Sequence, residues 1–321
     1  MNNFSNADPA DVSVCQLDHL GILVFDGPDS ANFLHGQLSN DIENLQSHSV
    51  ILAAYCNPKG RVITIMRILK ITPQRFLILM PKDLIETVAK RLRMFVLRAK
   101  VQVEILDQAV ILGLTDATLA SRINPNLPGD NQLLELSDSA WLIAVRPGET
   151  PVRYLYIAMD QNTADKHTTG IDCDGDSEHW LSIQAADGVP EVFHSTSEAF
   201  LPQGINLDLI DGVNFRKGCY PGQEIVARLR YLGKLKQRML RVRYNGSSHT
   251  AGENIYSSGK KIGQLVFGSP IDSRESDTRG NAGLVSVNFA NLDRDAVTFE
   301  DETAIEVFNL PYEVPELTES T

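Results

Sequence analysis

The sequence predicts an α+β fold with more than one domain, and three observations support this prediction. A chain of 321 residues is longer than one small hydrophobic core usually organises. Apolar residues in the segment 82–100 recur at helical spacing, whereas several other segments alternate or form the short apolar runs that are typical of strands. From Leu240 onward, short strand candidates alternate with Gly, Asn and Ser turns, which indicates an antiparallel barrel or sandwich.

The predicted elements of the first half alternate between strands and helices. Residues 22–25 form an apolar run that ends at turn residues, and Asp29 or Ser30 can cap a helix that reaches Leu38. Further along the chain, the pattern predicts strands at 51–55, 62–69, 75–80, 101–106, 108–114, 133–136, 141–145 and 153–159, and helices at 82–100 and 117–123. The segment 160–178 is polar and acidic, and we expect it to be a surface excursion.

Charge and composition argue against several classes of protein. The formal net charge of −12 disfavours general nucleic-acid binding, which needs clustered Lys and Arg. No apolar run of about twenty residues is present, so no membrane span is expected, and residues 1–10 lack the pattern of a secretory signal. The four cysteines form no Cys-x-x-Cys pair, so no metal site is expected from them alone. We therefore expect a cytoplasmic protein with free thiols.

One stretch after residue 227 departs from the acidic average. Seven cations lie between Arg228 and Arg243 with no acid among them, and the alternation at 239–244 predicts a strand with its arginines on one face. A solvated sheet face, an RNA surface and a surface that attracts a polyglutamate tail are three interpretations of this run.

The most informative segment surrounds Cys219. Arg216 and Lys217 precede the thiol, Gly218 and Gly222 permit a sharp turn around it, and a helix is predicted to begin near Pro221. A thiol beside cations and a helix N-terminus should have a lowered pKa, which suits a nucleophile, a metal ligand or a redox group. The alternative is a tight turn whose small cysteine only packs. A pairing of this thiol with His35 or His194 is a further hypothesis, for a thiol hydrolase.

The segment Lys217-Gly218-Cys219-Tyr220-Pro221-Gly222-Gln223-Glu224 resembles the signature octapeptide of the YgfZ family. These proteins are folate-binding relatives of the glycine-cleavage T-protein and include mitochondrial iron–sulfur assembly homologues. Residues 29–41 resemble the family's N-terminal helix and turn, and residues 56–61 resemble its next hairpin turn. Residues 180–183, followed by Gly-Val-Pro at 188–190, resemble the strand and turn before the signature. The order and rough spacing fit, and the resemblance extends to about residue 243.

The resemblance implies a three-domain, T-protein-like cloverleaf. Residues 1–50 and 160–235 would form a discontinuous folate-binding domain that carries the signature loop. Residues 51–159 would form a ferredoxin-like α+β insert, and residues 236–321 a C-terminal antiparallel β-barrel. Tetrahydrofolate or a derivative would lie in the central cavity where the domains meet.

The resemblance also implies which residues contact the folate. Trp180 is a candidate stacking surface, with core packing as the alternative, and Leu20 stands where family members can have a tryptophan. The glutamate that some members place before the Gly-x-Pro turn matches Ala186, and the adjacent Asp187 would point to the other face of a strand. The remaining folate-binding candidates come from the signature segment: Arg216, Gly218, Tyr220, Gly222, Gln223 and Glu224.

Cys219 and Lys217 are the candidates for chemistry. Cys219 would be a redox-responsive thiol or a transient ligand, with Lys217 and Arg216 holding it as a thiolate. Glycine cleavage is not expected, because the segment 61–66 lacks the carboxylate of T-proteins, and the hydroxyl of Thr64 has the wrong pKa for that acid–base role.

Two functions remain open at this point. The first is a folate-binding accessory protein in iron–sulfur cluster assembly or repair, which indirectly supports tRNA modification. Its partners would be iron–sulfur proteins, including tRNA-modifying radical enzymes, and direct nucleic-acid binding is not expected. The second is a folate-dependent one-carbon transferase with an unknown acceptor. A conventional enzyme is not expected; if the chain is an enzyme, it is predicted to be such a transferase.

Overall fold

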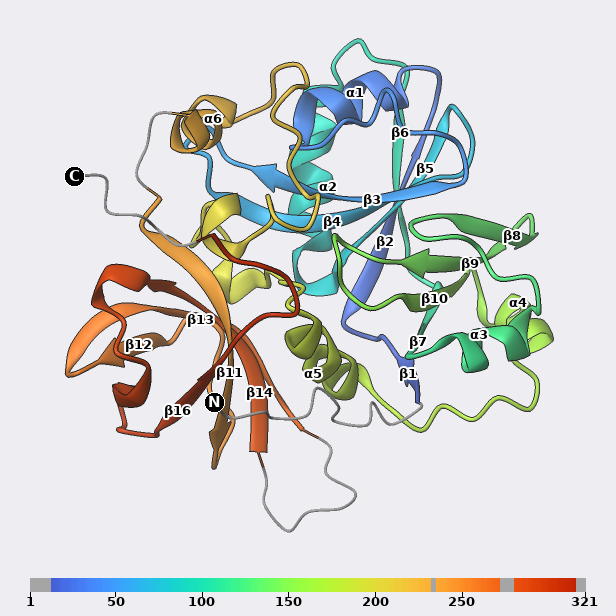
Figure 1. Ribbon diagram of the computed structural model, residues 1–321. Helices are drawn as coiled ribbons and strands as arrows, with labels where there is room; N and C mark the ends of the chain where they lie inside the picture. The colour runs from blue at the N-terminus through green and yellow to red at the C-terminus, as the bar shows by residue number, and fades with distance from the viewer. Residues whose placement is uncertain (1–12, 232–234, 272–279, 316–321) are drawn as a thin grey trace.

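The computed structural model describes residues 13–231, 235–271 and 280–315, and it contains three antiparallel β-sheets with helices packed on them (Figure 1). The mixture of helices and strands confirms the predicted α+β class. The helices are α1 (Ser30–Gln37), α2 (Lys82–Val96), α3 (Ala117–Ile123), α4 (Gln161–His167), α5 (Ser177–Asp187) and α6 (Gln223–Tyr231).

The first sheet has the strand order β3-β4-β5-β2-β6 and supports both candidate sites. Its strands are β2 (Leu20–Asp26), β3 (Ser49–Cys56), β4 (Val62–Lys70), β5 (Arg75–Pro81) and β6 (Gln102–Leu106). Both faces of β2 are covered, because Leu23 and Phe25 belong to the core cluster shared with α1 and α2, whereas Ile22 and Val24 face the cluster shared with the second sheet. This explains why β2 is a continuous apolar run instead of an alternating one.

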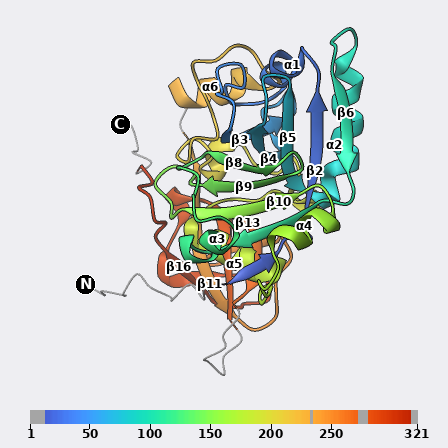
Figure 2. The same cartoon turned by 90° about the vertical axis from the view of Figure 1, so that its right-hand side faces the viewer.

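The second sheet has the order β1-β7-β10-β9-β8, and Figure 2 shows β8, β9 and β10 side by side. Its strands are β1 (Val14–Gln16), β7 (Val110–Leu114), β8 (Leu133–Ser137), β9 (Ala140–Val145) and β10 (Arg153–Ala158). One face packs on the first sheet through Trp141 and Ile157, and the other face is covered by α3 and α4. The chain therefore passes from one sheet to the other between β6 and β7.

The C-terminal region forms a curled six-stranded sheet, as its short strands and turns predict (Figure 1). The order is β15-β12-β13-β14-β11-β16. The strands are β11 (Gln237–Asn245), β12 (Asn254–Ser257), β13 (Lys260–Pro270), β14 (Gly280–Asn288), β15 (Val297–Thr298) and β16 (Ile305–Phe308). Helix α5 packs against β13 and β14 and also reaches β1, so it links this sheet to the rest of the molecule.

The predicted division into domains stays a prediction. The strand pairing adds one fact that bears on it: β2 forms seven register pairs with β5 and five with β6. The N-terminal segment that contains β2 thus shares a sheet with strands from the segment 51–159.

One element prediction was wrong. Residues 180–183 are part of helix α5 instead of a strand. The acidic stretch 160–178, expected to be a surface excursion, is mostly exposed and also contains the short helix α4. Asp176 caps α5 by accepting the backbone N–H of His179 at 2.9 Å, and Gly188 ends the helix in the left-handed conformation at φ 70°. A short apolar run does not by itself distinguish a buried strand from a buried helix, whereas these two caps do.

The helix predicted at 82–100 also ends earlier than its apolar pattern. Helix α2 stops at Val96, and Leu97 has a positive φ of 42° and is 87% exposed. Strand β1 lies outside the predicted elements altogether, because three residues are too few to show a period.

Candidate functional site

The signature loop is held against the turn between β3 and β4 by two glycines. Gly222 has φ 82° and Gly60 has φ 73°, a region that favours glycine. A Cβ atom on Gly222 would lie 2.5 Å from both the backbone oxygen of Asn57 and the Cα of Gly60. The signature and the hairpin turn, two motifs distant in sequence, therefore meet through direct backbone contact.

Lys217 ties the signature to the helix α1. Its ammonium group donates to the backbone oxygen of Leu38 at 2.6 Å and also to that of His35. These carbonyls lie at the C-terminal end of α1, where a positive charge is favourable. The side chain is 9% exposed, and burial lowers the pKa of Lys217 to about 8. Lys217 is close enough to Cys219 for an electrostatic interaction, but its hydrogen bonds go to the helix end.

Cys219 points outward from this anchored loop. Its side chain is exposed, whereas Cys15 and Cys56 are buried; Cys173 is exposed in a distant acidic loop. Gln223 closes the loop, because its side-chain amide donates to the backbone oxygen of Lys217 at 3.3 Å. The prediction of a helix beside the thiol is therefore close to the structure, although α6 begins at Gln223, two residues later than expected.

The other predicted signature residues divide into exposed and buried groups. Arg216 and Glu224 are exposed, so either can meet a ligand or partner from solvent. Tyr220 is buried, and burial raises the pKa of its hydroxyl well above the ordinary value. The ammonium group of Lys217 lies 5.1 Å from the Tyr220 ring centroid, so the tyrosine packs under the loop.

His35 lies next to the signature but is not hydrogen-bonded to the Cys219 thiol in the described structure. A Cβ on Gly218 would lie 3.4 Å from His35 Nε2, and His35 Nδ1 lies 3.3 Å from a carboxylate oxygen of Asp41. The backbone N–H of His194 donates to Asp83, on a different element. Among the described residues, neither histidine makes a hydrogen bond with Cys219.

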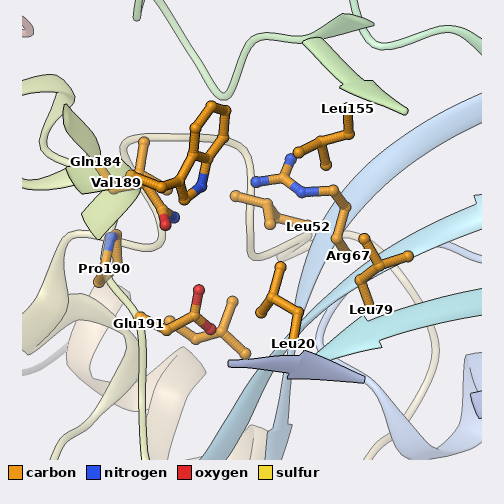
Figure 3. A pocket seen from close by; sticks show the side chains of 11 residues that line it. Leu20, Leu52, Arg67, Leu79, Leu155, Gln184, Val189, Pro190 and Glu191 are labelled. Atoms are coloured by element: carbon orange, nitrogen blue, oxygen red, sulfur yellow. The ribbon is translucent and has the colours of Figure 1, made fainter. Parts of the chain in front are cut away.

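A cavity lies further along the first sheet (Figure 3), and two of the predicted folate-binding residues, Leu20 and Trp180, line it. The residues of the signature octapeptide do not line it. Its walls are mostly apolar, and the polar side chains are Arg67, Gln184 and Glu191. Trp180 is 4% exposed, and a Cβ on Gly113 would lie 2.4 Å from its indole ring. The tryptophan is therefore both a core residue and a cavity wall.

The cavity is narrow. Its volume for the centres of water-sized molecules is about 30 Å³, which is room for about two waters. A planar ring enters only if side chains in the cavity move, and the longest of them belong to Arg67 and Glu191.

The charges in this cavity are strongly desolvated. Burial raises the pKa of Glu191 to about 7. Two neighbours act in the opposite direction and lower this pKa: the positive charge of Arg67 and a hydrogen bond from the side chain of Gln184. Burial also lowers the pKa of the Arg67 guanidinium to about 10, with Glu191 acting in the opposite direction. The side-chain oxygen of Gln184 is buried without a hydrogen-bond partner in the described structure.

These three polar residues were missed by the sequence analysis. The helix α5 turns Gln184 toward the cavity, whereas the match before the Gly-Val-Pro turn had pointed to Ala186. Asp187 is used elsewhere, since it forms a bidentate ion pair with Arg153 at 2.7 and 2.8 Å. Arg67 had one available signal: it interrupts the apolar residues Ile65, Met66, Ile68 and Leu69 of β4.

The thiol loop lies near the start of β4, whereas the cavity lies along the middle of this strand. Val62, at the start of β4, follows the turn that contacts the signature, and Ile65 and Arg67 line the cavity. Because a strand rises about 3.3 Å per residue, Val62 and Arg67 are about 16 Å apart. The predicted site residues thus form two groups on one sheet instead of a single cluster.

The basic run after the signature is distributed over both faces of β11. Arg241 and Arg243 lie on one face, with guanidinium carbons 5.2 and 5.6 Å from the Phe308 ring centroid, as the alternation predicts. Arg238 is on the other face, buried in a bidentate pair with Asp208 at 2.6 and 3.1 Å. Much of this charge is therefore committed to structural contacts.

The described parts of the chain contain neither a metal-binding cluster nor a membrane-spanning helix. Residues 13–231, 235–271 and 280–315 contain no group of three or more His, Cys, Asp or Glu side chains that could hold a metal ion. Within the same ranges, no helix is long and apolar enough to cross a membrane.

Comparison with solved structures defines the class of the fold. The glycine cleavage system aminomethyltransferase T from Bartonella henselae matches with a TM-score of 0.73 over 93% of this chain and 85% of that chain. The sequence identity is 16%, so this similarity shows the fold alone. The molecule is a T-protein-like α+β protein, which confirms the predicted cloverleaf class and its antiparallel C-terminal barrel sheet.

Sequence relatives are more specific. The tRNA-modifying protein YgfZ of Enterobacter sp. (strain 638) is 26% identical over 317 residues, which cover 95% of this chain and 94% of the relative. The protein of the same name from Photobacterium profundum is 28% identical over 289 residues, covering 81% and 85%. An uncharacterized protein of Haemophilus influenzae is 30% identical over 214 residues, covering 66% and 67%. No protein-family model matches the chain. The chain belongs to the YgfZ family.

Proposed function

We propose that this chain is a folate-binding accessory protein for iron–sulfur cluster assembly or repair, and that it supports tRNA modification through its client proteins. The observation that carries this proposal is the exposed Cys219 on a loop that is anchored by two other segments of the fold. The clients would be iron–sulfur proteins in the cytoplasm, including tRNA-modifying radical enzymes. The name of the relatives, tRNA-modifying protein YgfZ, agrees with such a role.

The anchoring of the loop supports a chemical role for the thiol. Gly222 fixes the loop on the β3–β4 turn, Lys217 fixes it on α1, and Gln223 closes it. A cysteine that only filled space would be buried, as Cys15 and Cys56 are. An exposed thiol in a fixed position suits transient bonding to a partner's metal cluster or sulfur.

The cavity at Leu20 and Trp180 is the proposed folate site. The unpartnered side-chain oxygen of Gln184 is an acceptor that suits an amino group of a pterin ring, and Trp180 offers an aromatic wall. The residues present therefore fit the chemistry of the ring, provided that side chains move to admit it. A bound tetrahydrofolate would supply a reduced pterin that can carry a one-carbon unit.

The second candidate is a folate-dependent one-carbon transferase, and Glu191 is the observation in its favour. A carboxyl group with a pKa of about 7 in a cavity suits proton transfer at neutral pH. Thr64 does not offer this chemistry, because it is fully buried and its hydroxyl donates to the backbone oxygen of Ile65 at 3.3 Å. Glycine cleavage is therefore not proposed.

Titration calorimetry of the reduced protein with tetrahydrofolate, followed by product analysis of the same sample, separates the two candidates. Binding without chemical change supports the accessory role, conversion of the folate supports the transferase, and an absence of binding removes the folate from both.

Cys219→Ala tests the thiol, with Cys173→Ala as the matched control because Cys173 is also exposed. In cells that lack the protein, Cys219→Ala is expected to leave iron–sulfur enzyme activity low, whereas Cys173→Ala restores it. Full restoration by Cys219→Ala would refute the proposed role of the thiol.

A further inference from the structure

The helix α6 exposes most of its surface beside the thiol loop. Of its nine residues, all within the described part of the chain, Val226 alone is buried, whereas the longer α2 buries five. Ile225 is 40% exposed and Tyr231 is 65% exposed, and Figure 1 shows α6 at the periphery of the molecule. A helix this short is marginal without tertiary packing. A partner with an apolar side chain would supply packing for these two exposed residues.

Contacts at both ends of α6 hold the helix beside the segment that carries Cys219. Near its start, a Cβ on Gly60 in the β3–β4 turn would lie 3.1 Å from the Cβ of Ile225. At its end, the Tyr231 ring meets the Phe215 ring edge-on, with the ring centroids 6.3 Å apart. Phe215 lies just before the signature octapeptide. The exposed side of the helix and the exposed thiol of Cys219 therefore belong to one surface.

This surface is basic, although the formal net charge of the chain is −12. The β3–β4 turn, the signature and α6 each contribute exposed cations, which are Lys59, Arg61, Arg216, Arg228 and Arg230. Among the described residues, none of these five forms an ion pair with a carboxylate. The acids Asp41 and Glu43 lie on the α1 side of the loop, beside Lys217. Positive charge thus collects around the thiol on the α6 side, where it attracts a partner of opposite charge.

The mixture of groups fits an acidic protein surface better than it fits RNA. Ile225 is aliphatic, so it gains from burial against another apolar side chain but not from contact with a phosphate backbone. Glu224, the neighbouring exposed residue of α6, would repel phosphates. Carboxylates arranged around an apolar centre complement both parts of this surface.

We propose that Ile225, Tyr231 and the cations around Cys219 form a docking surface for an acidic partner protein that places an apolar side chain against α6. This inference rests on the proposed function, because it takes the partner to be the client that the thiol meets. The charges bring the client to the loop, and the apolar contact fixes it there with its reacting group next to the exposed sulfur.

The test measures disulfide exchange between Cys219 and short peptides that mimic such a surface. Each peptide carries one cysteine as a mixed disulfide with 2-thiopyridine, flanked by two leucines and then by either glutamates or lysines. The Cys219 thiolate attacks the peptide sulfur, which yields a Cys219–peptide disulfide and releases pyridine-2-thione, and the absorbance of this product gives the rate. The reduced full-length protein carries Cys173→Ala, which removes the other exposed thiol.

Cys219 is expected to react about tenfold faster with the acidic peptide than with the basic peptide, and the ratio should approach one at about 1 M salt. Arg216→Glu/Arg228→Glu is expected to remove the preference. Lys90→Glu/Arg98→Glu is the matched control, because it makes the same change in net charge at exposed positions in α2 and just after it, and it is expected to keep the preference. If a charge variant unfolds by circular dichroism, the salt dependence of the parent protein decides instead.

Ile225→Ser tests the apolar centre of the surface. The parent protein is expected to react about threefold faster with the acidic leucine peptide than with an acidic peptide that has glycines in their place, and Ile225→Ser to make the two rates equal. A protein with Cys219→Ala and an intact Cys173 gives a second comparison. Cys173 lies between Asp172 and Asp174, so it is expected to prefer the basic peptide.

The outcomes separate this inference from the proposed function. Equal rates for the acidic and basic peptides, or a preference that persists in Arg216→Glu/Arg228→Glu, would overturn the docking surface, while cells that carry Cys219→Ala still decide the role of the thiol. A clear preference together with full restoration of iron–sulfur enzymes by Cys219→Ala would support the surface and remove that role. Binding of bulk tRNA that Arg216→Glu/Arg228→Glu abolishes, without a preference for the acidic peptide, would assign the surface to RNA and overturn the inference.

Discussion

Gly222→Ala should destabilise the protein by separating the signature loop from the turn between β3 and β4. Gly222 adopts φ 82°, and the added methyl group would lie 2.5 Å from the Asn57 oxygen and 2.6 Å from the Gly60 nitrogen. These contacts are with backbone atoms, so a side-chain rotation does not relieve them. Either the loop or the turn must move.

Two contributions set the size of the effect. A non-glycine residue in the left-handed region costs about 1–2 kcal/mol, and forcing a methyl group into a packed site costs about 1–3 kcal/mol. The expected loss in the free energy of unfolding is therefore about 2–5 kcal/mol. The exposed thiol of Cys219 should also change its rate of reaction with a thiol reagent, because its position depends on the same contact.

Urea denaturation followed by circular dichroism measures the first effect, and Gly218→Ala is the matched control in the same octapeptide. Gly218 does not have a positive φ, and the atom nearest to its added Cβ is His35 Nε2 at 3.4 Å, an ordinary contact. We expect the control to change stability by less than about 1 kcal/mol. An equal loss in both variants, or a loss below about 0.5 kcal/mol for Gly222→Ala, would refute the argument that this close approach requires glycine.

Three further predictions address other contacts. Lys217→Met should lower the free energy of unfolding by about 2–4 kcal/mol, because the Leu38 carbonyl at the end of α1 loses its charged donor. If stability in urea is unchanged, Lys217 would instead serve to hold the Cys219 thiolate. Asp208→Asn should lower the free energy of unfolding by about 3–5 kcal/mol in the same assay, since it leaves the buried Arg238 without its counter-charge. A smaller loss would show that water reaches the pair. Binding of a ring that donates two hydrogen bonds to Glu191 should weaken about tenfold from pH 8 to pH 6, because the carboxyl has a raised pKa of about 7 and accepts at both oxygens only when it is ionised. Glu191→Gln should remove this pH dependence, and a dependence that persists in the variant would assign it to another group.

Local sequence patterns predicted many elements but failed where a short segment allowed two structures. The apolar spacing of 82–100 gave helix α2, and the alternation after Arg238 gave β11 with Arg241 and Arg243 on one face. Trp180 was expected on a strand, because four residues cannot establish a period and the N-cap of α5, Asp176, lies outside the matched motif.

Sequence reasoning found residues of the candidate site but did not predict how they are arranged in space. Cys219 and Gly222 were found from an unusual local composition, and the structure places them on an exposed, anchored loop. Leu20 and Trp180 were found by resemblance, and both line the cavity. The signature and the cavity were expected together, yet the structure puts the signature near the start of β4 and the cavity along the middle of that strand.

The sequence by itself determined the class of the fold, the family and the identity of the thiol loop, because these depend on periodicity and on motifs that are contiguous in the chain. Only the tertiary structure decided that Arg67, Gln184 and Glu191 share a cavity, since a strand, a helix and a loop bring them together through packing between segments far apart in sequence. It also decided that Lys217 serves the end of α1 and that Asp187 pairs with Arg153. A charged side chain has the same appearance in a sequence whether it meets solvent, a counter-charge or a cavity, and burial alone distinguishes these cases.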